Sequence, residues 1–192
     1  MRLLFFLAGL LWLTWLPAQA TDPYAAIADR LAEYGRLTMD WNLEALLDLT
    51  DPELFEFVPR AVIYDQLAGL SSDENMDVQF ADFTVDRIGE LISHDGVDYV
   101  PVDFHHEMRF TMKSAAYQEP QVLQRMARML EKSYGQVTVD EAQTSVRLTA
   151  RKSMFAIRRA PTDAWYFVEF RPENSAMIDL LVPPVVREQF KK

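Results

Sequence analysis

The stretch VDYVPVDFHHEMRFTMK, which spans residues 97–113, has the strongest alternating pattern in the chain. Every second side chain from Val100 to Met112 is apolar except His106, and the side chains between them are mostly polar. This alternation predicts a long β-strand with one face on a hydrophobic core and the other face in water. Pro101 has no backbone N–H to donate, so we expect this end of the strand to lie at the edge of a sheet.

Further strands are predicted on both sides of this stretch. Asp95-Gly96, directly before it, is typical of a hairpin turn. Upstream, the runs 78–80 and 83–85 have their apolar residues at opposite parity, which predicts a bulge or a bend between them. Downstream, a helical stripe over 120–134 is followed by more alternating segments. These segments span residues 137–139, 145–151, 154–159 and 165–170.

The N-terminal half has helical spacing instead. Apolar residues recur every three or four positions over 24–39, which predicts an amphipathic helix. Asp40 or Asn42 can cap a second, shorter helix, and Pro59 begins a further helical segment. Helices followed by hairpin-connected strands indicate the α+β class. We therefore expect N-terminal helices packed on a curved, mostly antiparallel sheet, with the helix at 120–134 inserted between strands.

The first twenty residues have the organisation of a secretory signal peptide. Arg2 precedes a nearly unbroken apolar run over 3–16, and Pro17-Ala18-Gln19-Ala20 supplies a small-residue cleavage site. An uncleaved membrane anchor is the rival interpretation, but about 14 apolar residues are fewer than the roughly 20 that a spanning helix needs. We therefore expect residues 1–20 to be removed, with no stable membrane insertion afterwards. Residues 21–192 would then form a single exported domain, either periplasmic or secreted.

The composition argues against several partners and chemistries. Removal of Arg2 with the signal peptide leaves 18 basic against 29 acidic residues, a formal charge of −11 on the mature chain. This charge would repel nucleic acid and anionic lipid headgroups. The chain has no cysteine, three histidines and no nucleotide-binding glycine motif. We expect no disulfide, no cofactor and no metal site, and the oligomeric state is left open.

Basic side chains gather on the segments that are predicted to form the late strands. Two interpretations are open for this group. Its members either lie on an exposed sheet face and pair with acidic side chains, or form an anion-binding patch. They are Arg147, Arg151, Lys152, Arg158 and Arg159.

Two segments carry a resemblance to a known fold. Between Tyr34 and Phe55, a helix is followed by Met39-Asp40-Trp41-Asn42, a leucine-rich run and Asp51-Pro52-Glu53. Near the end, Ala164-Trp165-Tyr166-Phe167-Val168 has a tryptophan followed by alternating apolar residues. Both segments resemble nuclear transport factor 2-like domains, the SnoaL-like and cystatin-like cone folds. The resemblance spans residues 24–170, although the inserted helix and a C-terminal extension make this chain longer than a minimal member.

The resemblance implies a cone-shaped domain whose open end holds small apolar molecules. The family includes isomerases, dehydratases, cyclases and epoxide hydrolases, and it also includes non-catalytic binding and accessory domains. A ketosteroid-isomerase-like site would need an aspartate base that faces oxyanion donors. No residue of this chain matches that motif, so the resemblance assigns no catalytic residue.

His106 is the most informative single residue, because it interrupts an apolar strand face where an unpaired polar group costs about 1–3 kcal/mol. One interpretation is a neutral imidazole that is hydrogen-bonded within a filled core. The other is a residue that lines a ligand pocket together with Phe104, Met108 and Phe110, its neighbours on the same strand face.

These observations support two functions. The first is an exported, non-catalytic α+β domain that binds a small apolar ligand or a protein partner. The second is a cofactor-free isomerase-like or cyclase-like enzyme, with His106 or a nearby acid as the base. An enzyme requires an open cavity with at least two converging polar groups. A cavity lined only by apolar side chains favours ligand binding, and a filled core favours a protein partner.

Overall fold

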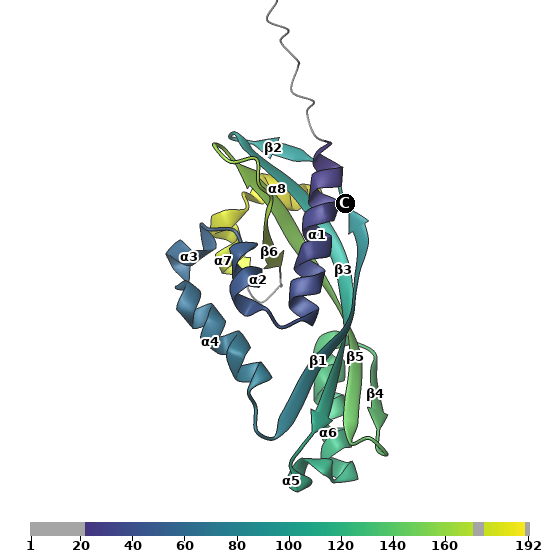
Figure 1. Cartoon of the computed structure of the whole chain (residues 1–192). Coiled ribbons are helices and arrows are strands. Elements are labelled where there is room, and N and C mark those ends of the chain that lie inside the picture. Colours follow the sequence, from purple (N-terminus) through teal and green to yellow (C-terminus); the bar gives the residue numbers. More distant parts are fainter. Residues whose placement is uncertain (1–21, 171–174, 191–192) are drawn as a thin grey trace, which may run out of the picture.

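The computed structural model describes residues 22–170 and 175–190. Within these ranges it has eight helices and an open sheet of six antiparallel strands (Figure 1). The residues that are expected to form the signal peptide lie outside the described residues. The helices are α1 (Pro23–Met39), α2 (Leu43–Asp48), α3 (Leu54–Phe57), α4 (Arg60–Ser71), α5 (Ala115–Gln118), α6 (Pro120–Tyr134), α7 (Ser175–Leu181) and α8 (Pro184–Phe190). The strands are β1 (Met76–Ile88), β2 (Ile92–His94), β3 (Val97–Met112), β4 (Val137–Asp140), β5 (Ser145–Arg159) and β6 (Tyr166–Phe170).

Strands β3 and β5 form the centre of the sheet. They pair without a register shift from Val97 opposite Arg159 to Thr111 opposite Ser145. The strand order is β1-β3-β5-β4, while β2 pairs with β3 and β6 pairs with β5. The predicted α+β class is confirmed, including the N-terminal helices on the sheet and α6 between β3 and β4.

The two segments predicted over 145–151 and 154–159 form one continuous strand, β5. The polar residues Lys152 and Ser153 interrupt the apolar pattern between these segments. Both keep the strand conformation, because the pairing of β5 with β3 continues through them. Their side chains bond to the adjacent strands, where Lys152 donates to Glu169 and Ser153 donates to Asp103.

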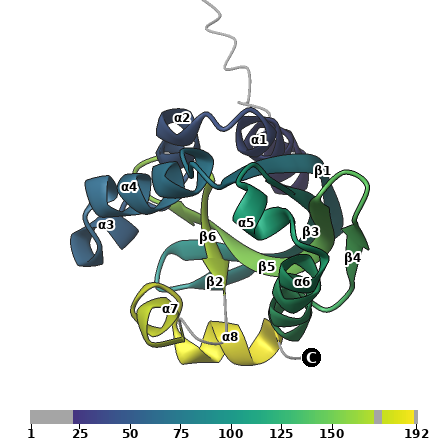
Figure 2. The same ribbon diagram turned by 90° about the horizontal axis from the view of Figure 1, so that it is seen from below.

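The sheet twists so strongly that one face packs on two different helices. At the upper end in Figure 1, Val102 and Phe104 pack in one cluster with Leu31 of α1. At the lower end, Met112 has the same parity but packs with Leu123 of α6. Figure 2 shows α1 and α6 on opposite sides of the strands. The right-handed twist of long strands therefore turns this face from one side of the molecule to the other.

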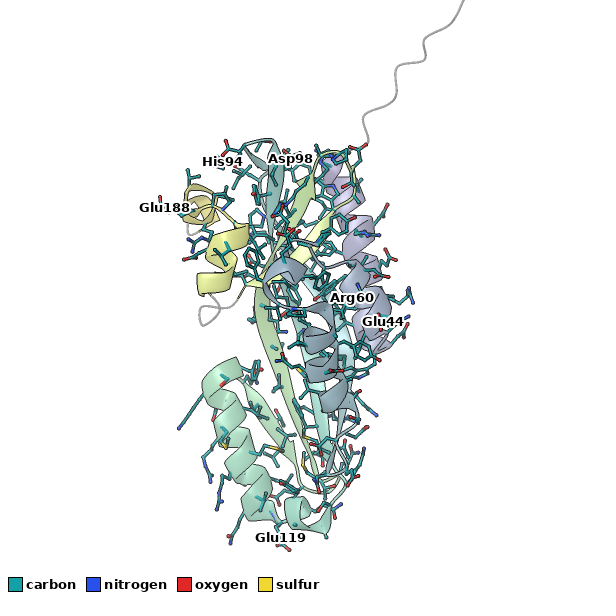
Figure 3. The ribbon with its side chains drawn as sticks, turned by 90° about the vertical axis from the view of Figure 1, so that its left-hand side faces the viewer. Glu44, Arg60, His94, Asp98, Glu119 and Glu188 are labelled. Atoms are coloured by element: carbon teal, nitrogen blue, oxygen red, sulfur yellow. The ribbon has the colours of Figure 1, made fainter. Side chains whose placement is uncertain are left out.

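The prediction that the second face of β3 lies in water is wrong at its upper end. Tyr99 and Pro101 belong to that face, yet both are buried. Tyr99 packs in a second cluster with Phe155 of β5 and with Ile178 and Val182 of the C-terminal segment. Figure 3 shows the yellow C-terminal helices α7 and α8 on one side of the upper sheet and α1 on the other. The upper sheet is thus covered on both faces.

The prediction that Pro101 marks a sheet edge is also wrong, because β3 lies between β1 and β5. The carbonyl of Pro101 accepts a hydrogen bond of 2.7 Å from the backbone N–H of Gly89. Gly89 lies in the short gap between the end of β1 and the start of β2. The missing N–H of Pro101 faces this gap, so a central strand tolerates the proline.

Local signals in the sequence agree with the backbone. The turn at Asp95 and Gly96 has positive φ angles of 49° and 78°, as a two-residue hairpin requires. The predicted bulge in β1 appears as a register shift between Phe80 and Asp82. Asn42 caps α2, where its side chain accepts a hydrogen bond from the Ala45 N–H. None of the helices in the described ranges has the length and apolar character needed to cross a membrane.

Gly35 allows α1 to approach β1 closely. A Cβ atom added at Gly35 would lie 2.8 Å from the Cγ atom of Phe83. We therefore expect the Gly35→Ala substitution to lower the free energy of unfolding by about 1–3 kcal/mol, as overpacking does. Gly69 in α4 is the matched control, because an added Cβ atom there meets nothing within 4 Å. Gly69→Ala should raise the free energy of unfolding by about 0.5–1 kcal/mol.

Urea unfolding of both glycine variants measures this contrast. A Gly35→Ala protein that is as stable as the Gly69→Ala protein would contradict the close packing of α1 on Phe83.

Candidate functional site

A cleft with a volume of about 500 Å³ lies between the N-terminal helices and the sheet. Helices α1, α2, α3 and α4 supply one side, and strands β1, β3, β5 and β6 supply the other. Most of the lining side chains are apolar. Those from the helical half are Trp41, Leu43, Leu46, Leu47, Leu54, Val58, Ile63, Leu67 and Leu70. Those from the sheet are Phe80, Phe83, Phe104, Phe167 and Val168.

Helix α4 forms the outer wall of the cleft. None of its residues is buried, although Ile63, Leu67 and Leu70 present apolar side chains to the cleft. Its first turn is held against α2 by Arg60, whose Nη2 atom lies 3.0 Å from Glu44 Oε2 and 2.8 Å from Asp48 Oδ1. Figure 3 shows the labelled Arg60 and Glu44 next to each other. Helix α4 is therefore fixed at its N-terminal end and has its apolar face on the cleft.

Aromatic side chains form the wall on the sheet side. The His106 ring meets Phe80 edge to face at a centroid distance of 5.2 Å and lies 6.0 Å from the Phe104 ring. Phe83 packs on Phe104 at 5.1 Å. Trp41 packs on Phe80 at 5.0 Å and donates its indole N–H to the Val78 carbonyl at 3.1 Å. His106 is only 2% exposed, so it contributes to the wall chiefly as an aromatic ring.

A polar group from three elements lies on the same cleft. The ammonium of Lys152 on β5 donates to Glu169 Oε2 on β6 at 2.9 Å. The hydroxyl of Tyr34 on α1 donates to Glu169 Oε1 at 3.0 Å. The side chains of Lys152 and Glu169 are 16% and 29% exposed, respectively. This linked group supplies the charged side chains of a mostly apolar cleft, whose other polar lining residues are Thr38, Thr50, Gln66 and His106.

The structure separates the four residues predicted to line one pocket. Phe104 and His106 line the cleft. Met108 and Phe110 do not. Met108 borders a different depression beside Arg109 and Arg147, and Phe110 packs against the α6 cluster around Leu123. The twist of β3 is the reason, because it turns the lower half of the predicted face away from α1 and towards α6.

The polar group Tyr34, Lys152 and Glu169 was missed as part of the site. Lys152 and Arg158 each pair with an acid, as one interpretation of the late-strand cations predicts, and Arg158 lies 2.6 Å from Asp98. Lys152 does not lie on an exposed sheet face, however, because it lines the cleft. The available signal was Glu169, an acidic residue in the apolar run from Tyr166 to Phe170.

A buried ion pair attaches the loop after α2 to the end of β5. Arg159 Nη2 lies 3.1 Å from Asp51 Oδ2, and Arg159 Nε lies 2.8 Å from Glu53 Oε1. Asp51 is only 1% exposed, and this burial raises its pKa in spite of the opposing attraction of Arg159. The same loop is joined to β6, where the Phe167 N–H donates to the Leu49 carbonyl at 2.8 Å. These contacts position the α2 and α3 side of the cleft.

The described residues contain no cluster of three or more carboxylate or imidazole side chains that could hold a metal ion. His105 instead has its Nδ1 atom 2.8 Å from Asp86 Oδ1, on the face of the sheet opposite to His106.

Comparison of the sequence with protein-family models and with curated proteins finds no match.

Proposed function

We propose that this protein is an exported, non-catalytic binding protein that holds a small apolar molecule in the cleft between α4 and the sheet. The observation that carries the proposal is the cleft itself, whose volume of about 500 Å³ is bounded mostly by apolar side chains, with leucine and phenylalanine the most frequent. Pockets for small molecules are typically of this size and are lined mostly by apolar side chains with a few polar groups. The cleft favours a small molecule over a protein partner as the ligand.

Two features of the sequence support the proposed export and the proposed kind of pocket. The organisation of residues 1–20 supports export to the periplasm or the exterior. The resemblance of 24–170 to nuclear transport factor 2-like domains supports a pocket between helices and a curved sheet. An apolar molecule has low solubility in water. Its transfer from water into an apolar cleft lowers the free energy of the molecule.

A cofactor-free isomerase-like or cyclase-like enzyme is the second candidate. It is favoured by one observation, namely that the titratable side chains His106, Lys152 and Glu169 all line the cleft.

Native mass spectrometry of protein purified from its own export compartment identifies the bound molecule. A molecule that is recovered unchanged after incubation with fresh protein supports binding. Conversion by the wild type but not by His106→Ala would favour the enzyme.

The binding proposal predicts that the protein takes up N-phenylnaphthylamine, a neutral probe whose fluorescence rises in apolar surroundings. We expect saturable binding at one site. The Leu67→Glu substitution places a charge on the cleft side of α4, so it should weaken binding at least about tenfold, because an unpaired charge is poorly tolerated among apolar groups. Fluorescence titration of both proteins gives the two dissociation constants.

Val62→Glu is the matched control on the same helix. Val62 is 43% exposed and does not line the cleft, so the added charge should leave the affinity within about twofold of the wild type. No fluorescence increase with the wild type, or an equal loss of affinity in the two variants, would contradict the proposal.

A further inference from the structure

The polar group Tyr34, Lys152 and Glu169 indicates which chemical class of apolar molecule the cleft selects. We infer that the ligand carries an uncharged head with a hydrogen-bond acceptor, such as a hydroxyl or a carbonyl, and that this head lies against Lys152. The inference rests on the proposed function, because it concerns the same cleft.

The position of Lys152 makes it the contact for such a head. Lys152 lies directly opposite Phe104 on the neighbouring strand and points to the same face of the sheet. A ligand whose apolar part packs on the Phe104 wall therefore reaches the ammonium at the same level of the cleft. Glu169 lies on the other side of Lys152, on β6.

Hydrogen-bonding capacity favours an acceptor on the ligand. An ammonium group has three N–H donors. Within the part of the chain that the structure describes, one of them is directed to Glu169 Oε2, and no second acceptor lies within hydrogen-bond reach of Nζ. A hydroxyl or carbonyl oxygen can accept a further hydrogen bond from Lys152 without displacing Glu169, and such charge-assisted bonds are stronger than neutral ones.

Charge disfavours an ionised head. A carboxylate at this point would be attracted by Lys152 but repelled by Glu169, whose carboxylate lies 2.9 Å from the same ammonium. The two interactions largely cancel, so the carboxylate would lose its hydration without an equal gain. An ammonium head would likewise be attracted by Glu169 but repelled by Lys152, so it would also lose its hydration without an equal gain. An uncharged head loses less hydration and keeps the hydrogen bond to Lys152.

The inference is tested by displacement of N-phenylnaphthylamine with decanol, decanoate and decylamine at neutral pH. For the wild type we expect decanol to displace the probe at a concentration at least about tenfold below those of the two ions. Decanol is also the most apolar of the three competitors, so its advantage in the wild type alone does not identify the role of charge. The decisive quantity is the change, from wild type to variant, in the concentration at which one competitor displaces the probe. Glu169→Gln leaves the Lys152 charge without its carboxylate, so decanoate should bind at least about tenfold more tightly than to the wild type.

Lys152→Met provides the reciprocal variant and an independent test should Glu169→Gln fail to fold. It removes the positive charge of Lys152 and keeps the carboxylate of Glu169, so decylamine should gain affinity while decanoate loses affinity. Glu107→Gln is the control, because Glu107 is exposed on the opposite face of β3 and borders a different depression. This variant should keep the wild-type order of competitors.

The inference is overturned when decanoate binds the wild type as tightly as decanol, or when Glu169→Gln does not strengthen the binding of decanoate and Lys152→Met does not strengthen the binding of decylamine. Both results are distinct from failure of the proposed function, in which N-phenylnaphthylamine does not bind the wild type at all.

Discussion

The Arg159→Ala variant is expected to lose about 3–5 kcal/mol of unfolding free energy, the range that is typical when one partner of a buried ion pair is removed. Arg159 lies 3.1 Å from Asp51, whose side chain is only 2% exposed. It also pairs with Glu53 and lies 3.5 Å from the carbonyl of Leu181. Removal of Arg159 therefore leaves a buried carboxylate and detaches the loop after α2 from β5.

This loss should depend on pH in a defined direction. Burial raises the pKa of Asp51 in the folded protein above its value in the unfolded chain, and Arg159 lowers it only in part. Without Arg159 this pKa rises further, so the folded variant binds the proton over a wider pH range than the wild type. The stability of the variant then falls more steeply as pH rises through that range. The stability difference between the two proteins should therefore shrink as the pH is lowered towards the ordinary pKa of aspartate.

Urea unfolding at neutral and at mildly acidic pH measures both effects. Arg151→Ala is the matched control, because Arg151 is exposed on the same strand and should change stability by no more than about 0.5 kcal/mol. A loss below about 1 kcal/mol for Arg159→Ala at neutral pH, or a loss that grows on acidification, would show that the pair does not anchor this loop.

The Phe155→Ala variant is expected to lose a similar amount, about 3–5 kcal/mol, because a fully buried phenylalanine leaves both lost burial and a cavity. Phe155 is 1% exposed and lies in the cluster that joins β5 and β6 to the C-terminal segment. Its removal takes a large buried side chain out of the cluster that contains Ile178 and Val182. Hydrogen exchange should consequently show faster exchange of the backbone amides over 178–186 than in the wild type.

Phe57→Ala is the control for this variant. Phe57 is 47% exposed on α3, so its removal should cost less than about 1 kcal/mol and leave the exchange of 178–186 unchanged. If Phe155→Ala unfolds at the same urea concentration as Phe57→Ala, the C-terminal helices do not cover a second core.

The sequence predicts the strands of this fold better than it predicts their surroundings. Alternation over 97–113 identifies β3, its parity and the side that packs on α1. It contains no information on how far a long strand twists, so the turn of Met112 towards α6 could not be predicted. Burial of Tyr99 depends on α7 and α8, which are distant in sequence. The position of Pro101 depends on the gap between β1 and β2 rather than on any local property of β3.

The same distinction applies to the candidate site. His106 and Phe104 were identified because a polar residue interrupts an apolar strand face, which is a local signal. Tyr34, Lys152 and Glu169 come from α1, β5 and β6, and only the folded chain brings them together. Residues of this kind are recognised from sequence only when each stands out alone, as Glu169 does within its apolar strand.

Methyl NMR spectroscopy during titration with N-phenylnaphthylamine shows whether the ligand lies in the cleft between α4 and the sheet. We expect the methyl signals of Leu46, Ile63 and Leu67, which line the cleft, to shift progressively and to saturate. Signals of Leu123 and Val139, in the separate α6 cluster, should stay in place. Saturable shifts confined to the α6 cluster, or no saturable shifts at the three cleft residues, would show that the cleft does not hold the ligand.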